Sequence, residues 1–151
     1  MKFKFIKSTD KEEVIVYAKE RNNLVDALES LCVIDNNLVG YYKDSIYELN
    51  INLIECFLTE NDKVYALIGK NKYLIKRRLY ELHELYKEMF IYINQGCLAN
   101  ISKISHFDAS IGGSLLVVFK SNYKDYVSRR RLKDIKERMG LKWWRELKNF
   151  A

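Results

Sequence analysis

Proline is absent from this 151-residue chain, histidine occurs twice and cysteine three times. Cys32, Cys56 and Cys97 lie far apart and form no CxxC or Cys/His spacing, so the sequence predicts neither a zinc site nor a disulfide framework. We interpret them as small buried side chains in a reducing compartment. The most apolar run, LLVVF at 115–119, is far too short to span a membrane. The opening MKFKFIKSTD lacks the apolar region of a signal peptide, so a cytoplasmic location is expected.

Signatures of catalysis are also missing. The chain contains no GxxxxGK[ST], GxGxxG or HExxH motif, and GGS at 112–114 is better explained as a hairpin turn. His83 and His106 have no nucleophile near them in sequence, which favours structural roles. Carboxylates such as Glu55 and Glu60 would suit Mg²⁺ in a nuclease, but such scatter is common to most proteins. We expect no catalysis, no metal, no cofactor and no small-molecule substrate.

The charge is unevenly distributed along the chain. The formal net charge is +6, yet residues 1–60 contain 7 Lys or Arg against 11 Asp or Glu, whereas residues 61–151 contain 19 against 9. A basic half behind an acidic half favours a polyanionic partner for the basic half. The alternative is a solvated surface that is merely basic.

Short apolar segments dominate the pattern. Alternation at 2–7 and 13–19 predicts two strands, and apolar spacing from Asn22 onward predicts a helix of about ten residues, which together form a small ββα unit. A further helix is predicted at 76–89. Beyond residue 45, strands separated by turn sequences are predicted at 46–50, 53–59, 63–69, 72–75, 90–94, 97–110, 114–120 and 125–128. No alternating βα pattern is present, so we predict an α+β fold that is predominantly β.

Two strand-to-helix junctions each carry three consecutive cations. In YVSRRRLKDI, Ser128 is a good helix N-cap, so the arginines at 129–131 are predicted to occupy the first turn of the last helix. In YLIKRRLYEL, the cations at 76–78 stand at the equivalent place. The helix macrodipole already makes this end positive, and a capping box would have Glu or Gln where Arg131 stands. Cations at such an end favour an anionic ligand, and a nucleic-acid backbone supplies one for both junctions.

The last ten residues, 142–151, form an amphipathic tail. Its apolar positions are Trp143, Trp144, Leu147 and Phe150. Such a tail most often packs on its own domain, and the alternatives are a dimer contact or binding to a membrane surface.

From about Asn50 to Leu141 the chain resembles the LytTR DNA-binding domain of bacterial transcription regulators. Four stretches carry the resemblance in the right order: NLIECFLTENDKVYAL, KYLIKRRLYELHEL, FIYINQGCLANISKI and YVSRRRLKDIKERMGL. The third is similar to a family element that opens with Phe and closes with Asn, here Phe90 and Asn100. The fourth matches the characteristic Val-Ser-Arg-Arg ending.

The resemblance implies a domain of about ten short, mostly antiparallel strands with two short helices, whose inter-strand loops enter successive major grooves on one face of double-stranded DNA. Carried over by position, the base-reading candidates are Lys63 in the loop at 59–63, Asn94, Gln95, Arg129 and Arg130. The phosphate-binding candidates are Lys76, Arg77, Arg78, Lys103 and Arg131. An arginine fork can bind a guanine edge bidentately.

The chain departs from the family pattern in two places. Residues 94–96 read Asn-Gln-Gly where the family often has a basic residue and Ser, which removes a cation. The first fifty residues lack the βα pattern of a phosphoacceptor receiver, so the chain resembles the stand-alone type, often encoded beside a membrane protein that could regulate it. We therefore expect a ββα extension at 1–45 as a candidate dimerisation element, a LytTR-like domain at 46–141 and the tail at 142–151.

The expected function is that of a sequence-specific transcriptional regulator that binds double-stranded DNA as a homodimer. The alternative is a non-catalytic interaction module whose basic face binds an acidic protein or an anionic membrane, with the tail as its anchor. A single-stranded RNA binder is less favoured because no aromatic-rich strand pair of the RNP type is evident.

Overall fold

The computed structural model describes residues 15–32, 37–109 and 112–140. The chain divides into two compact units, residues 1–35 and 36–151, which are described separately. In the first unit, α1 (Asn23–Cys32) begins after Asn22, whose side-chain oxygen accepts hydrogen bonds from the backbone N–H groups of Leu24 and Val25 at 3.1 Å each. This helix confirms the prediction from Asn22 onward. The strand predicted at 2–7 lies outside the described residues, and the described residues 15–22 form no strand.

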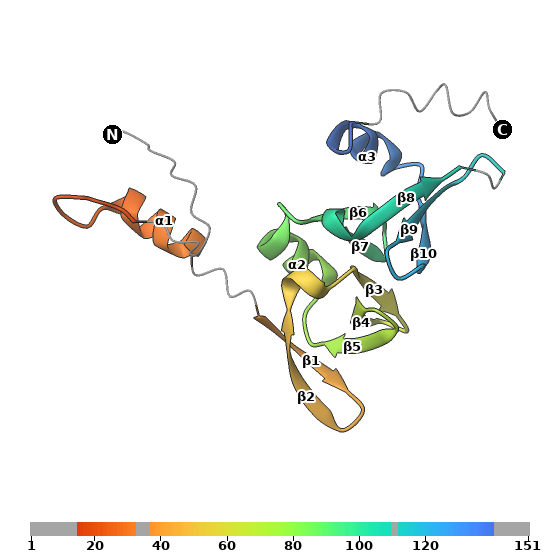
Figure 1. Ribbon diagram of the computed structural model, residues 1–151, viewed down its shortest axis with the longest axis horizontal. Coiled ribbons are helices and arrows are strands. Elements are labelled where there is room, and N and C mark those ends of the chain that lie inside the picture. The colour runs from red at the N-terminus through yellow and green to blue at the C-terminus, as the bar shows by residue number, and fades with distance from the viewer. Residues whose placement is uncertain (1–14, 33–36, 110–111, 141–151) are drawn as a thin grey trace. The chain divides into compact units, whose positions relative to one another are not determined.

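The described residues of the second unit form ten strands in two antiparallel sheets (Figure 1), which agrees with the predicted fold class. Its larger sheet has the order β2-β1-β5-β4-β3-β7-β6, and its smaller sheet has the order β10-β9-β8. The strands are β1 (Asn37–Tyr42), β2 (Ser45–Asn50), β3 (Cys56–Glu60), β4 (Lys63–Ile68), β5 (Asn71–Ile75), β6 (Phe90–Asn94), β7 (Cys97–Asn100), β8 (Ile104–Asp108), β9 (Leu115–Phe119) and β10 (Lys124–Val127). We predicted a domain boundary after residue 45, whereas the structure divides the chain after residue 35. The two positions differ because β1, which precedes residue 45, pairs with β2 and β5 of the large sheet.

Two-residue turns fix the pairing register of neighbouring strands. Asn61 and Asp62, with φ of 50° and 62°, join β3 to β4, and Glu60 pairs with Lys63 across this turn. Asn and Asp tolerate positive φ better than other side chains, which suits them to a tight hairpin turn. Gln95 and Gly96 join β6 to β7 in a second tight hairpin, in which Asn94 pairs with Cys97.

Strands β3 and β7 are buried on both faces of the large sheet, over residues 56–58 and 97–100. On one face Phe57 and Leu98 pack with Leu82 of α2 (Leu79–Tyr86). On the other face Cys56, Leu58, Cys97 and Ala99 pack against β9 of the small sheet and against Ile135 of α3 (Leu132–Arg138). The two clusters share no residue, so β3 and β7 separate two apolar layers.

Two short 3₁₀ segments, η1 (Ile51–Leu53) and η2 (Ile101–Lys103), interrupt the chain after β2 and β7. Each follows an asparagine whose side-chain oxygen accepts a backbone N–H two residues later, at 2.9 Å for Asn50 and 3.1 Å for Asn100. This local bond competes with strand pairing. The single strand predicted at 97–110 was therefore wrong, because Asn100 ends β7 and β8 begins in the other sheet.

Both helices of this unit are shorter than predicted. α2 covers residues 79–86 within the predicted 76–89, and the cations at 76–78 precede it. α3 begins at Leu132, so the first-turn position predicted for 129–131 was wrong. The described residues contain no helix long and apolar enough to cross a membrane, and the tail at 142–151 lies outside them.

Gly40 of β1 faces the core where β1 and β5 approach closely. A Cβ at this position would lie 2.5 Å from Leu49 Cδ1 and 2.9 Å from Tyr73 Cβ. We predict that Gly40→Ala lowers the free energy of unfolding by about 1–3 kcal/mol, because overpacking forces neighbouring groups apart. Urea denaturation followed by circular dichroism measures this. Val39→Ala, at a half-exposed position of the same strand, is the control, and a Gly40→Ala variant as stable as this control would contradict the overpacking.

Candidate nucleic-acid interface

The β3–β4 and β6–β7 turns lie at the same end of the large sheet. Leu58 pairs with Cys97, and the next backbone bond along runs from the Thr59 N–H to the Gly96 carbonyl at 2.8 Å. Lys63 and Gln95 are exposed at these two turns. The carboxylate of Glu60, next to Lys63 in the ladder, accepts a hydrogen bond from Lys72 at 2.6 Å. The sheet therefore presents a cation and a carboxamide at the same end.

The junction between β10 and α3 joins this same end through a backbone bond. The Ser128 N–H donates to the carbonyl of Ile93 on β6 at 2.9 Å. The Ser128 carbonyl then accepts the N–H groups of Arg131 at 3.0 Å and Leu132 at 3.1 Å, which closes a turn before the helix. Ser128 is therefore not the helix N-cap, because its backbone rather than its side chain organises the turn. Arg131 is the N-cap residue, and its side chain makes no cap bond.

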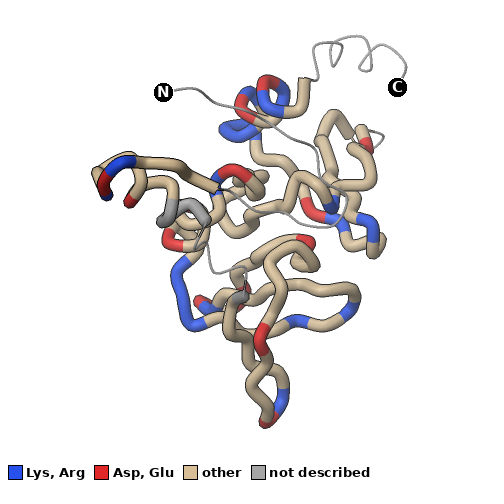
Figure 2. Tube along the Cα trace, turned by 60° about the vertical axis from the view of Figure 1, so that its left-hand side comes forward, with Lys and Arg blue, Asp and Glu red and all other residues tan. Residues whose placement is uncertain are grey.

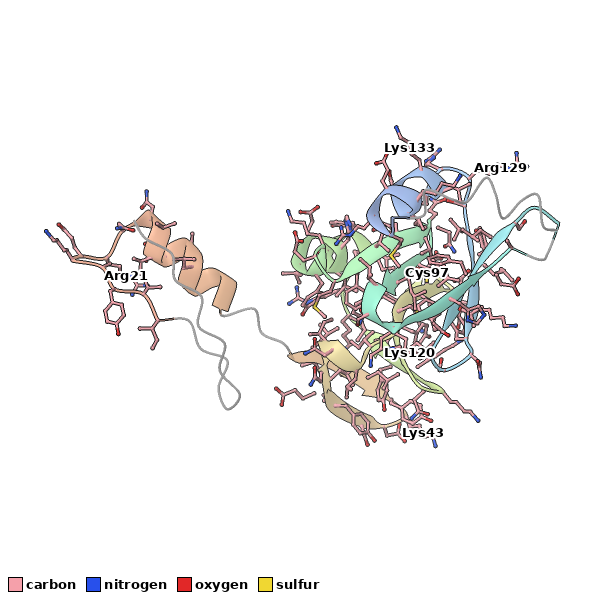
Figure 3. All side chains as sticks on the ribbon, turned by 45° about the horizontal axis from the view of Figure 1, so that its top comes forward. Arg21, Lys43, Cys97, Lys120, Arg129 and Lys133 are labelled. Atoms are coloured by element: carbon pink, nitrogen blue, oxygen red, sulfur yellow. The ribbon has the colours of Figure 1, made fainter. Side chains whose placement is uncertain are left out.

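Arg129 and Arg130 occupy this turn and are exposed. Among the residues that the structure describes, neither has an ion-pair or hydrogen-bond partner, whereas Arg131 has both a ring and a carboxylate beside it. Figure 3 shows Arg129 pointing away from the molecule next to α3. Two exposed guanidinium groups thus follow directly after the backbone bond to β6.

Arg131 is held by its neighbours. Its guanidinium carbon lies 4.7 Å from the ring centroid of Tyr92, and its Nη1 lies 3.8 Å from Asp134 Oδ2. The ring of His83 on α2 lies 4.8 Å from the Tyr92 ring, centroid to centroid. Burial raises the pKa of the Tyr92 phenol, although the guanidinium of Arg131 acts in the opposite direction. The two rings are tilted by 51° to each other, so His83 packs beside this aromatic ring.

Asn94 is placed differently from the exposed candidates. It is 4% exposed, and its amide nitrogen donates to Asp125 Oδ1 at 3.0 Å and to the Tyr126 carbonyl at 2.9 Å. Its amide oxygen accepts the Gly96 N–H at 2.9 Å. The base-reading role expected for Asn94 conflicts with this placement, because both amide hydrogens are used inside the protein. Sequence reasoning also missed Asp125 and Tyr92, which give no local signal of a role at this site.

The cations at 76–78 lie between β5 and α2, beside the first turn. Ile75 pairs with Val64, so the chain leaves β5 next to Lys63. Lys76 Nζ lies 4.5 Å from the Tyr41 ring centroid, and all three cations are exposed. The Glu81 carboxylate accepts the Arg78 N–H at 2.9 Å and places a negative charge in the first turn of α2. The negative charge of Glu81 offsets the positive end of the helix macrodipole, beside which the three cations stand.

Lys103 is not brought together with the other candidates. It follows Asn100, at the end of β7 opposite to Cys97, and its carbonyl accepts the N–H of Lys120 at 3.0 Å. Lys120 follows β9, whereas Arg129 follows β10 at the other end of the small sheet (Figure 3). The expectation that Lys103 belongs to the same phosphate-binding set conflicts with this separation.

The positive charges are grouped in separate segments of the chain, and uninterrupted blue stretches in Figure 2 mark the consecutive cations.

The interior of this unit holds titratable groups whose pKa is shifted by their surroundings. A hydrogen bond with Cys56 and burial raise the pKa of the Cys97 thiol. Burial and the nearby Asp125 likewise raise the pKa of Tyr123. Among the described residues, no group of three or more His, Cys, Asp or Glu side chains is arranged to hold a metal ion.

Comparisons with known proteins identify the family and the fold of this chain. Residues 44–140 match the LytTr DNA-binding domain family. Uncharacterized HTH-type transcriptional regulators of Staphylococcus aureus strains NCTC 8325 and N315 are each 30% identical, over 141 and 142 residues, and the match covers 91% of this chain and 96% of each relative. A solved LytTr DNA-binding domain from Bacillus cereus shares the fold, with a TM-score of 0.65 and 15% identity over 70% of this chain and 97% of that one.

The relatives' names refer to a helix-turn-helix, but five strands separate α2 from α3, and no two helices among the described residues are joined by a short turn. The solved LytTr domain shares the β-rich fold of this chain, and the family model matches its residues 44–140. The chain belongs to the LytTr DNA-binding domain family.

Proposed function

We propose that this protein is a sequence-specific transcriptional regulator that reads double-stranded DNA with three loops at one end of its large sheet. The observation that carries the proposal is the convergence of Lys63, Gln95 and the turn at 129–130, all exposed, through backbone bonds between neighbouring strands. Loops that project from a rigid sheet can reach successive major grooves, where each base pair presents a distinct edge.

The proposed roles follow from side-chain chemistry. Arg129 and Arg130 suit guanine edges, which accept a bidentate fork, and Gln95 suits adenine. Lys63 is a base-reading candidate of the first loop. The cations at 76–78 suit phosphate, because they lie beside Lys63 and a positive charge there strengthens binding without reading sequence.

Arg131 and Lys103 have weaker claims to phosphate. Arg131 is partly engaged with Tyr92 and Asp134, and Lys103 lies at the other end of the sheet. We retain Arg131 as a phosphate ligand because only part of its fork is used. Lys103 would contact DNA only if the duplex bends around the domain.

The proposal includes a homodimer on paired sites and a cytoplasmic location, without catalysis. The extension at 1–45 is the candidate dimerisation element, and a membrane protein encoded nearby is the candidate regulator. A rival function, binding of an acidic protein or anionic membrane by the basic face, would leave the arginine turn without a base to read.

Selection from a random duplex library tests the proposal directly. We expect an enriched motif, and a slope of log K against log salt near −5, as about six phosphate contacts would give. A motif made of two repeats would support binding by two copies. Equal weak binding to every duplex would contradict the proposal and favour the rival.

Two single substitutions separate base reading from phosphate binding. On the selected duplex, Arg130→Ala should cost about 1–3 kcal/mol and relax one base position, because a bidentate contact to a base edge is lost. Lys76→Ala should weaken all sequences about equally and reduce the salt slope by about one. Fluorescence anisotropy on a panel of single-base variants measures both. A loss at Arg130 that is uniform over all sequences would contradict its role as a base reader.

A further inference from the structure

We propose that Asn94 is a positioning residue, which holds the Gln95 turn and the Arg129–Arg130 turn in one fixed relation so that they bind DNA as a unit. The inference rests on the proposed function, because it concerns how the reading loops are held. It assigns Asn94 no contact with DNA.

The side chain of Asn94 has one arm toward each turn. Its oxygen accepts the N–H of Gly96, the residue that follows Gln95 in the β6–β7 turn. Its nitrogen donates to Asp125 Oδ1 and to the carbonyl of Tyr126, both on β10 shortly before Arg129. One planar carboxamide therefore connects a turn of the large sheet with a strand of the small sheet.

Burial makes these hydrogen bonds costly to break. Asn94 is 4% exposed, so water cannot easily replace a hydrogen bond that a movement of either turn would break. Both amide hydrogens are occupied, and a carboxamide is planar, so the directions of the two arms are linked. A displacement of the β10 end would therefore be transmitted to Gly96 and the exposed Gln95.

The backbone bond from the Ser128 N–H to the Ile93 carbonyl lies close to Asn94 but does not involve the β6–β7 turn. It joins β10 to β6 one residue before Asn94, and it leaves the orientation of the β6–β7 turn open. Asn94 adds the bond to Gly96, so only the carboxamide couples the two turns directly among these contacts. The hydrogen bond to Asp125 also explains why position 94 holds asparagine rather than aspartate. An aspartate there would have no hydrogen to donate, and its carboxylate would face that of Asp125.

Asn100 is a matched control within the same hairpin. It is 0% exposed, its nitrogen donates to the Ile54 carbonyl at 2.8 Å, and its oxygen accepts the Ser102 N–H at 3.1 Å. It lies at the opposite end of β7 from the reading turns. A change at Asn100 therefore disturbs a comparable buried carboxamide without touching either turn.

The experiment compares Asn94→Asp with Asn100→Asp in the full chain. Each variant keeps the oxygen that accepts a backbone N–H and loses the donor arm. We expect Asn94→Asp to weaken binding to the selected duplex about tenfold or more, with the loss confined to the base positions read by Gln95 and by Arg130. The salt slope should stay unchanged, because the phosphate contacts remain. Urea denaturation should show that both variants lose a similar free energy of unfolding. Asn100→Asp should nevertheless keep the wild-type base preference at the positions read by Gln95 and Arg130.

A second measurement needs no buried substitution. Gln95→Ala and Arg130→Ala change exposed side chains, and in the wild-type background their combined effect should fall short of the product of the single fold-losses, because the two turns act as a unit. Independent effects of Gln95→Ala and Arg130→Ala would overturn the inference, as would unchanged specificity of Asn94→Asp or an equal loss of specificity in Asn100→Asp. If the wild-type chain selects no motif, the proposed function fails; if it does and these variants behave independently, only the positioning role fails.

Discussion

The hydrogen bond between the Ser128 N–H and the Ile93 carbonyl is the point on which the arrangement of this domain depends. The Gln95 turn and the Arg129–Arg130 turn lie at one end only if β10, an edge strand of the small sheet, meets β6, an edge strand of the large sheet. The burial of Ile93, Val117 and Ile135 in one apolar layer brings the strands together, and the backbone bond sets their relative position. Apolar packing alone is not directional and would leave that position open.

The positive charges become understandable once this junction is in place. Because the Ser128 carbonyl closes a turn, α3 begins at Leu132, and Arg129 and Arg130 lie outside the helix. Arg131, which does stand at the positive helix end, is stabilised by the Tyr92 ring and by Asp134. Such a cation–ring contact contributes roughly 0.5–1 kcal/mol at an exposed site. Arg129 and Arg130, which have no ion-pair or hydrogen-bond partner among the described residues, are exposed to solvent, and this exposure suits the proposed contact with DNA.

Much of this architecture could be predicted from the sequence, because strand alternation and turn residues are local signals. The β-rich fold and the helix after Asn22 were predicted from such signals, whereas the family was predicted from the resemblance of four sequence stretches; all three are confirmed. The start of α3 could not be predicted, since a serine before an apolar helical pattern is normally an N-cap and only the pairing with β6 explains the extra turn. The burial of Asn94 and the remote place of Lys103 also depend on how the sheets meet. Polar residues in a turn look alike in sequence whether they face solvent or another strand.

The central claim is that loops at one end of the sheet read base edges in successive major grooves. Methylation interference tests it most directly, because methylation at guanine N7 blocks the major-groove edge. On the duplex that the wild-type chain selects, we predict interfering guanines in clusters about 10 base pairs apart, on one face of the helix. Binding that tolerates methylation of every guanine, and responds only to modification of phosphates, would contradict the claim.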